Sequence, residues 1–354
     1  MHVDKFCSAI ALWIPVLRIL AFLRFSASFA QKVFKTSGRQ IFMKIVEEVG
    51  RLIKEGKPLE ALEFLKENSS DDVRSVIEEL FKDPTKIKEL EGTWRALVGL
   101  AFFSYNSMSL SEEPFDRESV VSCLISSVNA VKLSRELGLN YLVPKFLRIG
   151  AKSLIVMKMN DRAEKFYLEA EKIARELSDL EELAEVENDI ALLYYSEKRY
   201  EEALPKIQIS LEIREKIGNK EKLAECLINA GEIYRKVGDY ALAEDSFKRA
   251  EEIYRELVNF DRSYKFDLAI ALSNLGTFYK ARRRYEEAER MLKETLDLFE
   301  ELETKDKNFG QFVAASLKHY GDLKKEMGDY KEAEEYYKMS ADKFKEVMYG
   351  RMKY

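Results

Sequence analysis

Residues 224–257 read AECLINAGEIYRKVGDYALAEDSFKRAEEIYREL, and residues 269–302 repeat the same arrangement as AIALSNLGTFYKARRRYEEAERMLKETLDLFEEL. In the first stretch, Gly231 is followed twelve residues later by Ala243, with Gly238-Asp239-Tyr240 between them. Glycine accepts a left-handed backbone conformation, and an aspartate side chain can cap the helix that follows. Each stretch is therefore predicted to fold as two helices joined by a short turn.

The same spacing recurs in five units between residues 144 and 347. Each unit has a small residue, called here the anchor, and the anchors are 40, 40, 45 and 45 residues apart: Ala151, Ala191, Gly231, Gly276 and Gly321. The residues twelve positions after the anchors are all alanine: Ala163, Ala203, Ala243, Ala288 and Ala333. The residues sixteen positions after the anchors are large and apolar: Tyr167, Ile207, Phe247, Leu292 and Tyr337. Small residues at facing positions let two helices approach to about 8–10 Å, so the pattern predicts antiparallel helical hairpins that share a core.

This pattern resembles the tetratricopeptide repeat family. The residues of the central unit that match the signature of the family are Leu227, Ala230, Gly231, Tyr234, Ala243, Phe247, Ala250 and Tyr254. The usual period of the family is about 34 residues, whereas the period here is 40–45. The longer period is similar to that of kinesin-light-chain-like adaptor repeats. The resemblance implies an all-α fold, a right-handed α-solenoid of stacked antiparallel helix hairpins.

The rest of the chain is less regular. We predict five repeats over residues 144–354, a diverged repeat over 87–143 and a helical N-terminal cap over 43–86. Residues 1–42 carry six basic residues and one acid, and they are apolar from Phe6 to Ala30 except for Arg18 and Arg24. Three interpretations of this segment stay open: a misassigned start before Met43, a signal or membrane-anchoring segment within residues 1–30, or an amphipathic helix on a membrane surface.

Composition excludes several classes of function. The net charge is −5, and because residues 1–42 carry +5, the remainder carries −10, which argues against a nucleic-acid binder. Cys7, Cys123 and Cys226 are far apart, so neither a disulfide framework nor a thiolate metal site is expected, and a reducing, cytoplasmic location is the default. With two histidines and no nucleotide-binding or hydrolase motif, we expect no enzyme activity, no cofactor and no metal.

A binding groove is predicted on the first helix of each unit. Residues two before, one after and four after each anchor share a face, because they are three positions apart. From these positions and their neighbours, the predicted groove residues are Asn229, Asn274, Arg235, Lys280, Lys325, Asp189, Tyr195, His319, Arg148 and Lys152. Asn229 and Asn274 occupy equivalent positions, and the resemblance implies that such asparagines hold the backbone of an extended peptide. Arg235, Lys280 and Lys325 form a basic row that favours an acidic peptide or a terminal carboxylate. Arg148 and Lys152 lie near the positions of the chaperone-tail clamp known in part of the family, but the rest of that pattern is missing.

The sequence therefore predicts a scaffold or adaptor that binds a protein or peptide segment in a concave groove. The alternative is a regulatory, effector-sensing repeat protein of a transcription or signalling system, although the N-terminal block shows no clear helix-turn-helix. Membrane association through residues 1–30 and self-association both stay open.

Overall fold

The computed structural model describes residues 36–90, 92–109 and 117–351, and within these residues the regular structure is entirely helical. The α-helices are α3 (Thr36–Lys54), α4 (Pro58–Glu67), α5 (Asp71–Glu79), α6 (Gly92–Ser109), α7 (Arg117–Glu136), α8 (Val143–Val156), α9 (Asn160–Glu176), α10 (Leu180–Ser196), α11 (Tyr200–Ile217), α12 (Lys220–Val237), α13 (Tyr240–Phe260), α14 (Lys265–Ala281), α15 (Tyr285–Lys305), α16 (Gly310–Met327) and α17 (Tyr330–Arg351). The short 3₁₀ helices are η1 (Pro84–Glu89), η2 (Asn140–Leu142), η3 (Arg262–Tyr264) and η4 (Lys307–Phe309).

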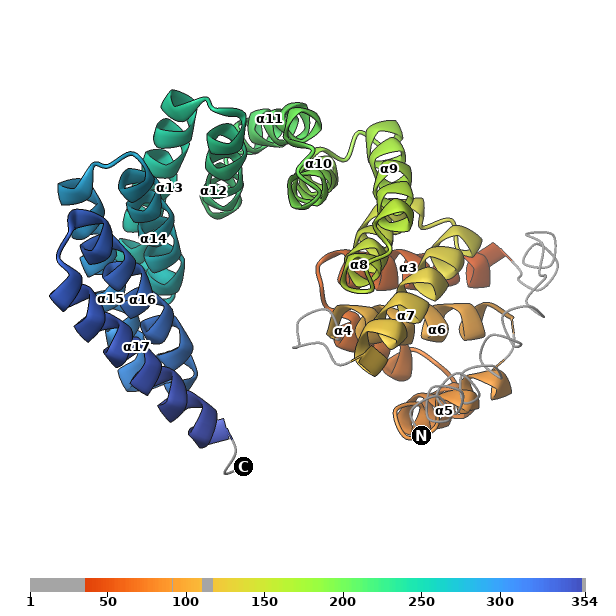
Figure 1. Ribbon diagram of the computed structural model, residues 1–354. Coiled ribbons are helices and arrows are strands. Elements are labelled where there is room, and N and C mark those ends of the chain that lie inside the picture. The colour runs from red at the N-terminus through yellow and green to blue at the C-terminus, as the bar shows by residue number, and fades with distance from the viewer. Residues whose placement is uncertain (1–35, 91, 110–116, 352–354) are drawn as a thin grey trace. The chain divides into compact units, whose positions relative to one another are not determined.

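The described residues divide into two compact units, the first ending at Asp189 and the second beginning at Ile190. In the second unit, α12 packs against α13, α14 against α15 and α16 against α17, while α13 and α15 each pack against the first helix of the next hairpin (Figure 1). In the first unit, α6 packs against α7, α7 against α8 and α8 against α9. Stacked helical hairpins thus form both units, which confirms the predicted all-α repeat architecture.

The glycine anchors lie where two helices touch. A Cβ atom built on Gly231 would lie 2.6 Å from the ring of Phe247, and one built on Gly276 would lie 2.8 Å from Leu292. Real Cβ atoms essentially never approach a neighbour this closely. The two helices approach closely at the anchor, as predicted. The residue that faces the anchor is the large one sixteen positions later, not the alanine twelve positions later that the spacing suggested.

The first helices are followed by residues whose backbone has a left-handed conformation. Gly238 has φ +96° and Gly328 has φ +94°. The Asp239 side chain accepts a hydrogen bond from the backbone N–H of Leu242 at 3.1 Å, which caps α13 as predicted. In the other three repeats the equivalent positions also have positive φ although they carry side chains: Lys158, Lys198 and Arg283. The turn geometry is thus common to all five repeats, whichever residue occupies it.

The longer period comes from longer second helices. Both α13 and α15 have 21 residues, whereas α9 has 17. Each of the longer helices is followed by a 3₁₀ turn, η3 or η4, that leads into the next repeat. The side chains of Asp261 and Asp306 cap these turns by accepting hydrogen bonds from the backbone N–H two residues ahead.

The junctions between repeats are apolar. Tyr254 on α13 is buried against Leu268 of the next first helix, α14. One repeat later, Phe299 on α15 is buried in the same way against Val313 of α16. Fully burying an aromatic side chain stabilises a fold by about 1.5–3 kcal/mol, so these junctions bind successive hairpins into one array.

The N-terminal predictions are only partly covered by the described residues. Residues 1–35 lie outside them, and the three interpretations of that segment stay predictions. Residues 36–42 form the first turns of α3, so the predicted boundary after residue 42 falls inside a helix. Across the described part of the chain, no helix is both long and apolar enough to span a membrane.

Candidate functional site

The predicted groove residues of the second unit lie on the first helices α12, α14 and α16 and on the last turn of α10. Asn229, Asn274, Lys280 and His319 are half-buried, and Lys325 is exposed. Polar side chains on the same face of successive first helices, half-buried except for Lys325, are called here the first-helix band. Its members are Tyr195, Asn229, Glu232, Arg235, Asn274, Lys280, His319, Asp322 and Lys325.

The two asparagines occupy the centre of the first-helix band. The side-chain amide of Asn274 donates a hydrogen bond of 2.9 Å to the backbone carbonyl of Ile270, one turn earlier on α14. An asparagine amide has two N–H donors and a carbonyl acceptor, so this single bond leaves Asn274 able to donate once more and to accept.

At one end of the band, Tyr195, Glu232 and Arg235 form a hydrogen-bonded cluster. The Tyr195 hydroxyl donates to Glu232 at 3.1 Å, and the Arg235 guanidinium donates to the same carboxylate at 2.5 Å. Burial and the Glu232 carboxylate raise the pKa of Tyr195 to about 12, and the hydrogen bond with Glu232 raises the pKa of Arg235. The charge of Arg235 is therefore balanced inside the chain, which removes one member from the predicted basic row.

At the other end, a recess of about 360 Å³ opens between α14 and α16. Its lining residues are Lys280, Asp322, Lys325, Glu326 and Tyr330. Lys280 Nζ lies 3.9 Å from the carboxylate of Glu326, a loose ion pair, and Lys325 forms no ion pair within the described residues. The Tyr337 hydroxyl donates to Asp322 at 2.8 Å, which holds that carboxylate in place.

His319 lies next to this recess. Its Nδ1 atom is buried and has no hydrogen-bond partner within the described residues. Burial, and then the positive charge of Lys280, lower the pKa of His319, although Asp322 acts in the opposite direction. The imidazole is therefore neutral at pH 7, so it can either donate or accept a hydrogen bond.

This shift predicts a pH-dependent stability. Because the folded-state pKa of His319 lies below its unfolded value of about 6.5, the unfolded chain takes up the proton first as the pH falls. The stabilising contribution of neutral His319 is full above pH ~6.5 and is lost as the pH falls through the folded-state pKa. Urea unfolding at pH 7.5 and 5.5 should show a larger loss of stability for the natural chain than for His319→Gln. Equal losses would contradict the assigned shift.

In the first unit, the three predicted groove residues are joined to each other. Arg148 on α8 donates to Asp189 at 2.9 Å, and its side chain is only 12% exposed. The same guanidinium donates to Glu182 at 2.9 Å and to Glu185 at 2.8 Å, all on α10. Burial alone would lower the pKa of Arg148, but the three carboxylates outweigh it and raise the pKa. Lys152 Nζ also lies 3.3 Å from the Asp189 carboxylate. The ion pairs of this cluster therefore hold α8 against α10.

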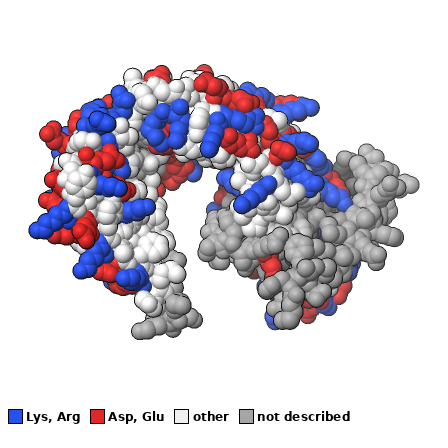
Figure 2. All heavy atoms as spheres, in the orientation of Figure 1, with Lys and Arg blue, Asp and Glu red and all other residues white. Residues whose placement is uncertain are grey.

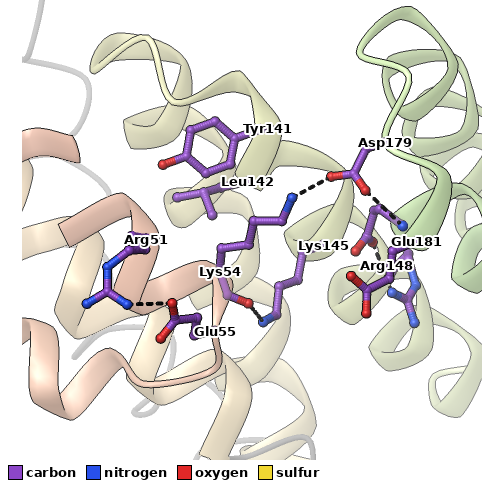
Figure 3. A pocket seen from close by; sticks show the side chains of 10 residues that line it. Arg51, Lys54, Glu55, Tyr141, Leu142, Lys145, Arg148, Asp179 and Glu181 are labelled. Carbon is purple, nitrogen blue, oxygen red and sulfur yellow. Dashed lines mark hydrogen bonds and ion pairs between the residues drawn. The ribbon is translucent and has the colours of Figure 1, made fainter. Parts of the chain in front are cut away.

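A pocket of about 510 Å³ lies beside this cluster (Figure 3). It is lined from α3, from η2 with the start of α8, and from the start of α10: Arg51, Lys54, Glu55, Tyr141, Leu142, Lys145, Arg148, Asp179, Glu181 and Glu182. Lys145 donates to the backbone carbonyls of Ile53 at 3.3 Å and of Lys54 at 3.0 Å, which caps the end of α3. Burial lowers the pKa of Lys145, whereas the hydrogen bond to Asp179 at 2.8 Å raises the pKa of Lys54.

Sequence reasoning missed this pocket. Lys54 and Asp179 are 125 residues apart, and neither belongs to the repeat pattern. The only local signal is Gly50, where a Cβ atom would lie 2.2 Å from the Tyr141 hydroxyl. Without knowledge of the fold, that glycine has no visible partner in the sequence.

Other reactive groups are consistent with a packing role. Cys123 and Cys226 are buried and not joined in a disulfide, and burial raises the pKa of Cys123. Among the described residues, no group of three or more His, Cys, Asp or Glu side chains could hold a metal ion. On the face shown in Figure 2, acidic and basic side chains are interspersed rather than gathered into a field of one sign.

Comparison with known proteins now identifies the repeats. Residues 182–256 and 267–346 match the family model of the tetratricopeptide repeat. These two segments belong to the tetratricopeptide repeat family, as the sequence predicted. A search of curated protein sequences finds no match.

Solved structures share the fold at low sequence identity. BtubC (BKLC) from P. vanneervenii is 20% identical, with 66% of this chain and 93% of that chain covered and a TM-score of 0.55. The apo form of RapI is 18% identical, with 87% and 98% covered and a TM-score of 0.56. The apo form of the quorum sensor NprR from B. thuringiensis is 14% identical, with 89% and 82% covered and a TM-score of 0.55. Identities this low establish a common architecture only.

Proposed function

We propose that this chain is a protein-interaction scaffold that holds an extended peptide or partner segment against the first-helix band of its second unit. The observation that carries the proposal is the recurrence of half-buried polar side chains at equivalent positions of α12, α14 and α16. Tetratricopeptide repeats generally act as repeat scaffolds rather than as enzymes, and solenoids of this kind bind partners on the surface lined by successive repeats.

The asparagines suit the backbone of a partner. An amide that both donates and accepts can pair with a peptide bond without requiring a particular side chain. Asn229 and Asn274 occupy the same position in adjacent repeats, two residues before the anchor. An extended segment that crosses α12 and α14 would meet one asparagine on each helix. The two amides would hold its backbone across both helices without requiring particular side chains.

The recess at α14 and α16 suits an acidic group of the partner. Lys280 and Lys325 both line it, and within the part of the chain that the structure describes neither has an ion-pair partner closer than the 3.9 Å contact of Lys280 with Glu326. A carboxylate between them would form charge-assisted hydrogen bonds that the loose contact with Glu326 does not supply. Because Glu232 balances Arg235, we confine the acidic preference to this end of the band.

Capture of the partner tests the proposal. The full chain is used as bait in an extract of the source cells, and the affinity of the captured partner is measured for Asn229→Ala/Asn274→Ala. We expect at least a tenfold loss of affinity, about 1.4 kcal/mol, because two backbone contacts are removed. Asn308→Ala is the matched control, since Asn308 is exposed in η4, outside the band, and should bind as the natural chain does. Unchanged capture by the double variant, with its helical content intact, would place the contact elsewhere.

A second candidate is a regulatory sensor that changes state when a peptide effector binds. The observation that favours it is the extent of the likeness to RapI and to the quorum sensor NprR, which covers 87% and 89% of this chain and so reaches beyond the matched repeats. A sensor should change its hydrodynamic radius or its protease sensitivity when the effector binds, whereas a passive scaffold should not.

A further inference from the structure

The pocket beside Lys145 in the first unit has the size of a small-molecule site. Its volume is about 510 Å³, and small-molecule sites in proteins occupy about 300–1,000 Å³. Three separate stretches of the chain line it, namely the end of α3, η2 with the start of α8, and the start of α10 (Figure 3). The charged side chains on these stretches decide which kind of molecule fits.

Most of the charges that line the pocket are already compensated in pairs. Each pair joins one cation to one carboxylate at 2.5–2.9 Å: Arg51 with Glu55, Lys54 with Asp179, and Arg148 with Glu182. A ligand that bound one of these side chains would have to displace a partner that is already in place. These pairs therefore do not select a ligand.

Two lining residues of opposite charge form no ion pair within the described residues, Lys145 and Glu181. Lys145 is half-buried, and its Nζ donates only to the backbone carbonyls of Ile53 and Lys54. An ammonium has three N–H donors, so one N–H of Lys145 stays available. Glu181, the second residue of α10, is exposed. The pocket thus offers one uncompensated cation and one uncompensated carboxylate.

The Lys145 ammonium lacks a counter-ion in a place where a charge is costly. Burial lowers the pKa of Lys145, and the carboxylates of Glu182 and then Glu181 act in the opposite direction from beyond ion-pair distance. The backbone carbonyls replace part of the lost hydration but carry no net charge. A ligand carboxylate at the available N–H would form a charge-assisted hydrogen bond and supply the counter-ion.

We propose that this pocket binds a small zwitterion, a molecule with one carboxylate and one protonated amine such as an amino acid, whose carboxylate binds Lys145 and whose amine binds Glu181. The two uncompensated charges decide against a singly charged ligand. An anion alone would bind Lys145 but lie close to the Glu181 carboxylate, and a cation alone would meet the Lys145 ammonium as a like charge. The site goes beyond the scaffold function proposed for the second unit.

Matched small molecules test the proposal with the full chain. The zwitterions are the common L-amino acids together with β-alanine, γ-aminobutyrate and ε-aminocaproate, which place the amine at increasing distances from the carboxylate. The controls are analogues of the tightest binder that lack either the amine or the carboxylate. Titration calorimetry should give at least one zwitterion a dissociation constant about tenfold or more below those of its two analogues. Binding of no zwitterion, or equal affinity for the analogues, would overturn the proposal.

Variants of the chain locate the site. Glu181→Gln should weaken binding of the zwitterion about threefold or more, whereas Glu201→Gln should leave it unchanged. The two glutamates are matched, because each is the exposed second residue of its helix and forms no ion pair in the described part of the chain, but Glu201 lies outside the pocket. Lys145→Met should weaken binding about tenfold or more. Because Lys145 also caps α3, circular dichroism and urea unfolding check that this variant is folded.

A charge reversal separates recognition of the ligand from a structural effect. Glu181→Lys removes the carboxylate that receives the amine, so this variant should bind the analogue without the amine at least as tightly as the zwitterion. An unchanged preference for the zwitterion in Glu181→Lys, or full affinity in Lys145→Met, would place the ligand elsewhere and contradict the proposal. The Asn229→Ala/Asn274→Ala variant should bind the zwitterion normally, so failure of this proposal and failure of the groove proposal can be told apart.

Discussion

Replacement of Arg148 by methionine is expected to destabilise the first unit by about 3–5 kcal/mol. The substitution leaves the carboxylates of Glu182, Glu185 and Asp189 close together without the cation that joins them. Removing one partner of a buried ion cluster costs this much because the remaining charges stay desolvated and repel one another. Urea unfolding followed by circular dichroism, with the slope of the transition compared between variants, measures the loss.

The control for this experiment is Arg74→Met. Arg74 pairs with Asp71 at 3.1 Å, but the aspartate side chain is 95% exposed. Exposed ion pairs contribute about 0–1 kcal/mol, so this variant should stay close to the natural chain. A loss below about 1 kcal/mol for Arg148→Met would mean that solvent screens the cluster and that it does not hold α8 to α10.

Introduction of alanine at Gly231 should cost about 1–3 kcal/mol. The added Cβ would lie 2.6 Å from the Phe247 ring, so either the ring or the helix must shift, and overpacking of this kind destabilises by that amount. The loss should appear even though alanine is the better helix former by about 1 kcal/mol. Urea unfolding again provides the measurement.

A second substitution, at Phe247, should restore part of the lost stability. In the preceding repeat the anchor is Ala191, and the residue sixteen positions later is Ile207, which is smaller than phenylalanine. The double variant Gly231→Ala/Phe247→Ile copies that pair and should be more stable than the sum of the two single variants predicts. Strict additivity of the two losses would show that the anchor and the aromatic ring do not compete for the same space.

The fold could be predicted from the sequence because close packing restricts particular positions. An anchor that faces a large side chain must be small, and this requirement recurs with the period of the repeat, so it is visible in the sequence alone. The turn was visible for the same reason at Gly238 and Gly328, whose φ angles are positive. It was less visible where lysine or arginine adopts the same conformation, because those residue types do not mark a left-handed backbone.

The candidate site could be predicted only in outline. Helical spacing predicts that Asn229, Asn274 and Lys280 lie on successive first helices. It does not show which side chains on that face are already hydrogen-bonded within the chain. Whether a side chain is already engaged depends on what reaches it from the neighbouring helix. Arg148 is surrounded by carboxylates of α10, a contact that helical spacing does not show. The pair of Arg235 with Glu232 is different, because Glu232 lies three residues earlier on the same helix and that spacing is visible in the sequence.

The pocket at Lys145 could not be predicted from the sequence, because Gly50 marks a close contact without showing its partner, Tyr141. In this pocket, α3 is separated from α8 by about ninety residues, and nothing in the spacing of the sequence links the two helices. Contacts of this kind depend on how the irregular N-terminal helices dock on the repeats, and that docking follows no period.

The most direct test of the central claim is hydrogen exchange of the full chain with and without its captured partner. If the first-helix band is the binding surface, the backbone amides of α12, α14 and α16 should exchange more slowly in the complex, because a bound segment suppresses local opening of these helices. Those of α13 and α15 should change little. Slower exchange confined to the second helices or to the first unit, with α12, α14 and α16 unchanged, would contradict the account.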